Sequence, residues 1–115
     1  MMTNDGRDVL RDAINSDFSS CQAGTGTFAF NKDQTGLFFP IAVTLNTLST
    51  KFKSSNVISV THVIDITEAN SSTLSEWEIL GNSDAVNYNR IVTNGFLKDS
   101  QTEITMIQVF SLERI

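Results

Sequence analysis

The chain has 115 residues, of which 40% are hydrophobic and 18% are charged, and its formal net charge is −5. This length suffices for a modest core, so we expect a single domain over residues 1–115. Its eight Lys and Arg residues are scattered along the sequence. No concentrated positive face for nucleic-acid binding is therefore expected.

One cysteine, Cys21, and one histidine, His62, are present. With one residue of each kind, an intrachain disulfide and a zinc site built from Cys and His ligands are both excluded. We find no secretory signal and no long apolar stretch, so we expect synthesis in the cytoplasm and no membrane partner. The triplet Asn70-Ser71-Ser72 matches a glycosylation acceptor, but without a secretory signal it is interpreted as a turn.

The first predicted element is an amphipathic helix over residues 5–16, with Asn4 or Asp5 as its N-cap. Its apolar stripe is narrow, so we expect it to lie against a sheet or a neighbouring subunit. The residues of this stripe, which recur at helical spacing, are Val9, Leu10, Ala13 and Ile14.

The segment from Phe18 to Pro40 has no clear strand period and is interpreted as a long connection rich in aromatic residues. A Gly-Thr-Gly-Thr run at 24–27 and a polar turn at 31–34 interrupt it. Its phenylalanines either seal one end of the core or contact a partner protein, and the sequence leaves both interpretations open. These residues are Phe28, Phe30, Phe38 and Phe39.

Alternating apolar and polar residues, separated by polar turns, predict a series of strands in the rest of the chain. The expected strands span residues 41–49, 58–64, 74–80, 86–92 and 103–112. Short strands after a single helix are typical of a mainly β protein, an antiparallel β-sandwich or small barrel with one N-terminal amphipathic helix.

The last predicted strand carries apolar residues on both of its faces. Ile107 and Val109 lie on the face opposite Met106 and Phe110. A strand of this kind is central in a sandwich or packs beneath a partner. We therefore add Ile107 and Val109 to the four phenylalanines as candidate subunit contacts.

No residue is assigned a catalytic role, and no cofactor or metal site is assigned either. Glu76 and Glu78 lie two apart on a predicted strand, and we interpret their shared face as solvated. His62 lies on an apolar strand face, which is typical of a hydrogen-bonded core or interface histidine. The Gly24-Thr25-Gly26 run lacks the rest of a phosphate-binding motif.

Short motifs follow one another in a characteristic order along most of the chain. They are Asp5-Gly6-Arg7-Asp8, Gly24-Thr25-Gly26-Thr27, Thr35-Gly36-Leu37 with Pro40, Ile66-Thr67-Glu68-Ala69, Leu74–Leu80 and Asn89-Arg90-Ile91-Val92. In this order the chain resembles a group of small bacteriophage structural proteins and phage tail-fibre attachment domains. The resemblance implies a β-sandwich without enzymatic activity or cofactor that occurs in multiple copies.

We therefore expect a non-enzymatic structural component of a bacteriophage virion, made in the host cytoplasm. A tail, baseplate, neck or fibre-attachment protein is the leading hypothesis, and a capsid decoration protein of the phage head is the alternative. The expected partners are other virion proteins and copies of the chain itself, in a homo-oligomeric assembly.

Two hypotheses from other classes remain open. In a carbohydrate-binding module, Trp77 or Tyr88 is an exposed platform that stacks on sugar rings. In a small hydrolase, His62 acts with Glu76 or Cys21.

Overall fold

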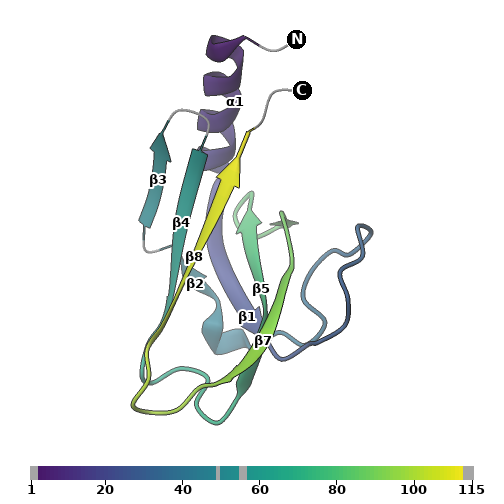
Figure 1. Ribbon diagram of the computed structural model, residues 1–115, viewed down its shortest axis with the longest axis vertical. Helices are drawn as coiled ribbons and strands as arrows, with labels where there is room; N and C mark the ends of the chain where they lie inside the picture. The colour runs from purple at the N-terminus through teal and green to yellow at the C-terminus, as the bar shows by residue number, and fades with distance from the viewer. Residues whose placement is uncertain (1–2, 49, 55–56, 113–115) are drawn as a thin grey trace.

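The computed structural model describes residues 3–48, 50–54 and 57–112 (Figure 1). The protein is mainly β, with one N-terminal helix and antiparallel sheets. Its elements are α1 (Asn4–Asp17), β1 (Phe18–Gly24), the 3-10 helix η1 (Ala42–Thr44), β2 (Asn46–Thr47), β3 (Thr50–Ser54), β4 (Val57–Ile64), β5 (Thr73–Gly81), β6 (Val86–Asn87), β7 (Ile91–Leu97) and β8 (Ile104–Ser111).

The strands form two sheets. In the first sheet, β5 is central. β1 pairs with one edge of β5, and β2 pairs with the far side of β1. β6 and β7 both pair directly with the other edge of β5, one after the other along it. The second sheet has the order β3-β4-β8. Within the described residues, β7 and β8 pair with different sheets although they are consecutive in the chain.

The core lies between these two sheets. Apolar side chains of β1 and β5 pack against those of β4 in two neighbouring clusters, so burial of these faces holds the sheets together. The first cluster contains Phe18, Cys21, Ile58, Val60 and Ile79. The second contains Ala23, Ile64, Ala69, Leu74 and Trp77.

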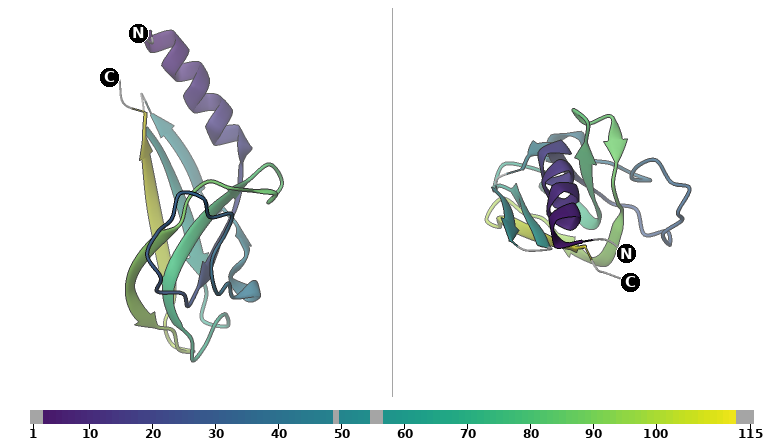
Figure 2. Two further views of the ribbon diagram at one scale, coloured as in Figure 1. Left: turned by 90° about the vertical axis from the view of Figure 1, so that its right-hand side faces the viewer. Right: turned by 90° about the horizontal axis from the view of Figure 1, so that it is seen from above.

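Helix α1 confirms the predicted N-terminal helix, but the predicted N-cap is wrong. Thr3 is the cap, and its hydroxyl accepts a hydrogen bond from the backbone N–H of Gly6 at 3.1 Å. Ile14 packs on the core, whereas Val9 and Leu10 are exposed. The helix extends beyond the sheets (Figures 1 and 2), and the radius of gyration is 14.9 Å, compared with about 13 Å for a compact domain of this size.

The predicted strands 58–64, 74–80 and 103–112 are confirmed as β4, β5 and β8. Burial alternates strictly along β4, so the apolar face read from its sequence is the buried face. β8 is an edge strand, paired with β4 alone among the described strands. Of the two positions predicted for it, central in a sandwich or beneath a partner, the central one is therefore wrong.

The predicted connection from Phe18 to Pro40 was wrong over its first seven residues, which form β1. β1 follows α1 directly and pairs with β5 along its length. Its register shifts between Phe18 and Ser20, and its burial does not alternate. Without a period of two, the strand leaves no clear pattern in the sequence.

The predicted strand 41–49 is also wrong in its first half, which forms η1. Thr44 is fully buried, and its hydroxyl accepts a hydrogen bond from the N–H of Ala23 at 2.9 Å. The side chain of Thr44 thus takes the place of the backbone carbonyl that a paired strand would offer to Ala23. Val43 and Leu45, which were predicted on a strand face, are exposed. Within the prediction, only Asn46–Thr47 forms a strand, and position 49 lies outside the described residues.

The predicted strand 86–92 is divided between β6 and β7. Both segments pair with the same edge of β5, β6 near its end and β7 near its start, and residues 88–90 between them are not in a strand. The Asn94-Gly95 pair, whose residue types are typical of a turn, lies within β7. Tertiary pairing with β5 overrides the local turn preference here.

Replacing Thr44 by Val tests the contribution of this buried hydroxyl. The variant keeps the shape but leaves the N–H of Ala23 without its partner, so we expect the free energy of unfolding to fall by about 1–3 kcal/mol. Urea unfolding followed by tryptophan fluorescence measures the change. Thr47→Val, at an exposed position, is the matched control and should change stability by less than about 0.5 kcal/mol.

Candidate functional site

A buried ion pair joins Glu76 of β5 to Arg90, which lies between β6 and β7. Nε of Arg90 is 2.8 Å from Oε1 of Glu76, and both side chains are 0% exposed. The predicted solvated face of Glu76 and Glu78 is therefore wrong, since both residues are buried. The sequence signal for the pair was an arginine alternating with apolar residues in the predicted strand 86–92.

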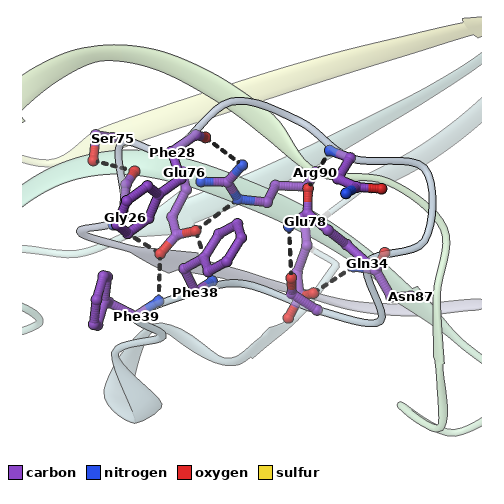
Figure 3. Close-up of polar contacts among 12 residues, drawn as sticks. Gly26, Phe28, Gln34, Phe38, Phe39, Ser75, Glu76, Glu78, Asn87 and Arg90 are labelled. Carbon is purple, nitrogen blue, oxygen red and sulfur yellow. Dashed lines mark hydrogen bonds and ion pairs between the residues drawn. The ribbon is translucent and has the colours of Figure 1, made fainter.

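The segment that covers Glu76 is residues 25–39, named here the Phe loop. The carboxylate of Glu76 accepts three backbone N–H groups of this loop (Figure 3). Gly26 donates to Oε2 at 2.8 Å, Phe38 to Oε1 at 3.0 Å and Phe39 to Oε2 at 2.8 Å. Both arms of the loop are thus held by one side chain.

These contacts determine the ionisation of Glu76. Burial alone raises the pKa of this carboxyl, but the hydrogen bonds from Arg90 and from three backbone N–H groups outweigh burial. The pKa of Glu76 consequently lies below its ordinary value. Glu78, which forms no ion pair within the described part of the chain, shows the opposite effect: burial raises its pKa, and the charge of Glu76 adds to the rise.

Arg90 makes two further contacts with the Phe loop. Its Nη1 donates to the carbonyl oxygen of Phe28 at 2.7 Å, and its guanidinium carbon lies 4.7 Å from the centroid of the Phe38 ring. The second contact has the geometry of a cation–π interaction. The ion pair therefore fixes the backbone of the loop and the position of one of its rings.

Two glycines permit the close approach of the loop to β5. A Cβ atom at Gly26 would lie 2.6 Å from Oε2 of Glu76, and one at Gly24 would lie 2.4 Å from the carbonyl oxygen of Phe39. The hydroxyl of Ser75 donates to the carbonyl oxygen of Gly26 at 2.8 Å. The Gly-Thr-Gly run is therefore a packed segment and not the flexible turn that its sequence indicates.

The predicted contact residues of the Phe loop lie on the surface. Phe28, Phe30, Phe38 and Phe39 are 45–61% exposed, so they do not seal the core. The ring of Phe28 lies 5.1 Å from that of Phe38 and 6.2 Å from that of Phe39, measured between centroids. A small aromatic cluster thus projects from a backbone that is held from beneath.

The other two predicted contact residues lie elsewhere. Ile107 and Val109 are 59% and 62% exposed on the outer face of β8, opposite Thr61 and Ser59 of β4. They belong to the second sheet, whereas the Phe loop is bonded to the first. The structure therefore separates the six predicted contact residues into two surfaces.

The three residues proposed for a hydrolase are buried, and two of them, His62 and Glu76, are hydrogen-bonded to other groups of the protein. The Nε2–H of His62 donates to the carbonyl oxygen of Thr44 at 2.9 Å, and burial lowers the pKa of this histidine. Burial and the nearby charge of Glu78 raise the pKa of Cys21 to about 12. Glu76 is bonded to Arg90, so these groups do not form the arrangement that a nucleophile and its base require.

The two aromatic residues proposed for carbohydrate binding differ in their exposure to solvent. Trp77 is 1% exposed and its indole N–H donates to the hydroxyl of Thr93, so it cannot stack on a sugar. Tyr88 is partly exposed, and its hydroxyl donates to Asp17. The platform expected at Trp77 is therefore absent.

Among the residues described, no three His, Cys, Asp or Glu side chains are close enough to hold a metal ion. In the same part of the chain, no helix is long and apolar enough to cross a membrane. In comparisons with known proteins, no protein-family model matches this sequence, and no curated protein matches it at a significant level.

Replacing Glu76 by Gln tests the ion pair. The variant leaves the buried guanidinium of Arg90 without a counter-charge, so we expect the free energy of unfolding to fall by about 3–5 kcal/mol. Urea unfolding at pH 7 measures the loss. Glu78→Gln on the same strand is the control: because burial raises the pKa of Glu78, its neutral replacement should leave stability unchanged or higher. Equal losses in both variants would contradict the proposed role of the pair.

The ion pair should also give stability a pH dependence. The pKa of Glu76 is lowered on folding from an ordinary value of 4.5. The contribution of this carboxylate is therefore complete above pH 4.5 and is lost as the pH falls through the lower, folded pKa. Unfolding curves across this range should show the wild type and Glu76→Gln converging in strong acid. A stability difference that stays constant would exclude this origin.

Proposed function

We propose that the chain is a non-enzymatic structural subunit of a bacteriophage virion that acts by association with other protein surfaces. The observation that supports this most is the Phe loop, in which four exposed phenylalanines are carried on a backbone held by a buried ion pair. In this proposal the two facing sheets are a β-sandwich, and the loop is one of its contact surfaces.

The physical argument concerns the cost of binding. Aromatic side chains are enriched in the buried centres of protein interfaces, where few residues supply most of the binding energy. Ordering a mobile loop reduces affinity, whereas a loop already held in place avoids that loss. Glu76 and Arg90 hold the loop from beneath and leave the rings outside, which is the arrangement that an interaction surface requires.

The place in the virion rests on the resemblance in motif order. A tail, baseplate, neck or fibre-attachment component is favoured, with capsid decoration of the head as the alternative. A ring would favour a tail part and the capping of hexamers would favour decoration of the head, whereas a trimer occurs in both classes. The carbohydrate-binding hypothesis is weakened by the burial of Trp77.

A phage that lacks its own copy of the chain provides the test. We expect the wild-type protein, supplied in trans, to be incorporated into particles, and Phe30→Ser to be incorporated about tenfold less, which corresponds to ~1.4 kcal/mol of lost contact energy. Quantitative mass spectrometry of purified particles measures the incorporation.

Lys32→Ser, at an exposed polar position of the same loop, is the matched control and should be incorporated like the wild type. Absence of the wild-type chain from purified particles would refute the virion assignment. Equal incorporation of wild type and Phe30→Ser would show that the Phe loop is not the contact surface.

A further inference from the structure

The second sheet ends at β8, and this edge is long and regular. β8 pairs with β4 from Ile104 to Ser111 without a shift in register. Among the described strands, none pairs with its other side. A free edge presents a row of backbone N–H and C=O groups that can pair with another chain.

The edge at β8 lacks the features by which sheets normally prevent such pairing. From Ile104 to Ser111 the sequence contains no charged residue, no proline and no glycine. The opposite edge strand of the same sheet, β3, contains Lys51 and Lys53 within its five residues. Edge lysines oppose strand addition because pairing would desolvate or juxtapose their charges. Only one of the two edges is protected in this way.

The other strand edges are less suited to pairing. β2 and β6 contain two residues each. β7 pairs irregularly with β5 and includes the Asn94-Gly95 pair, which weakens a strand. β8 is therefore the edge at which an additional strand would form the longest uninterrupted ladder.

We propose that β8 pairs with β8 of a second copy, antiparallel and about a two-fold axis at Gln108, so that two three-stranded sheets form one six-stranded sheet. This inference rests on the proposed function in one respect: it names a second copy as one of the partners that an assembly subunit needs. Interfaces that use the same patch on both subunits are the commonest kind in homo-oligomers.

The register follows from strand geometry. Along a strand, successive side chains point to opposite faces of the sheet, and directly opposite residues of two paired strands share a face. Odd-numbered residues of one β8 must therefore lie opposite odd-numbered residues of the other. Placing the axis at Gln108 sets Ile107 of each copy opposite Val109 of its partner. With the axis at Ile107, Val109 of each copy would lie opposite Thr105 of the other. With the axis at Val109, Ile107 of each copy would lie opposite Ser111. The chosen register gives the most apolar contact between opposite residues.

Charge restricts where two copies can meet. Each chain carries a formal net charge of −5, so two copies repel each other over most of their surfaces. β8 brings no charge to the contact, and pairing places Ile107 of each copy beside Val109 of the other, so these exposed side chains gain cross-strand apolar contacts. The strand is therefore a region where like-charged copies meet without placing charges opposite one another.

Cysteine cross-linking tests the pairing and its register. Ile107→Cys and Val109→Cys are prepared separately, and each is oxidised alone and in an equimolar mixture. We expect disulfide-linked dimers mainly in the mixture, because only there does a cysteine lie opposite a cysteine. The native Cys21 should not interfere, since it is buried.

Light scattering of the unmodified chain over a concentration series provides the second measurement. We expect a concentration-dependent dimer, and we expect the double variant Ile107→Lys/Val109→Lys to be a monomer with unchanged circular dichroism. Val92→Lys, which alters an exposed apolar residue on β7, is the control and should still dimerise.

The outcomes separate this inference from the proposed function. A wild-type monomer that gives no cross-links overturns β8 pairing, and the virion proposal then still stands or falls with incorporation of the chain into particles. A third outcome combines two results: the cysteine variants give no cross-links, yet Ile107→Lys/Val109→Lys is no longer incorporated into particles. It would overturn pairing with a second copy and indicate that β8 pairs with a different virion protein.

Discussion

The buried ion pair between Glu76 and Arg90 is the interaction on which the rest of the structure depends. Removing two charges from water is costly, and their attraction offsets the cost only when hydrogen bonds satisfy both groups. The carboxylate of Glu76 meets this condition by accepting three backbone N–H groups from the Phe loop. Arg90 meets it through Nε and Nη1, whereas its Nη2 is buried without a hydrogen-bond partner among the described residues. The ion pair therefore requires the loop to fold over β5, and the loop in turn excludes water from the pair.

This requirement gives the two sheets different roles. β5 is covered on one face by the core and on the other by the Phe loop, so the first sheet presents the aromatic cluster that the loop carries. The second sheet exposes Ile107 and Val109 on its outer face and, among the described strands, has an unpaired edge at β8. Under the proposed assembly function, these two surfaces would let one subunit bind two neighbours at once, and repeated weak contacts of this kind build a stable assembly.

The parts of the fold that were predictable have regular periods. Helix α1 repeats its apolar residues at helical spacing, and β4 alternates apolar and polar residues along its full length. β1 was not predictable because its register shift removes the alternation. Of the candidate site, the sequence singled out the four phenylalanines but left open whether they seal the core or face a partner. The ion pair beneath them was misread as a solvated glutamate and a strand arginine.

By itself, the sequence determined a mainly β chain with an N-terminal helix, because the spacing of apolar side chains differs between helices and strands. Along β4 this spacing also marks the buried face, whereas in α1 Val9 and Leu10 of the predicted stripe are exposed. Tertiary structure alone decided that Glu76 is buried beside Arg90, that residues 42–44 turn into a 3-10 helix around the hydroxyl of Thr44, and that β8 lies at an edge. Each of these depends on segments far apart in the chain, and contacts of that kind leave no periodic pattern in the residues that make them.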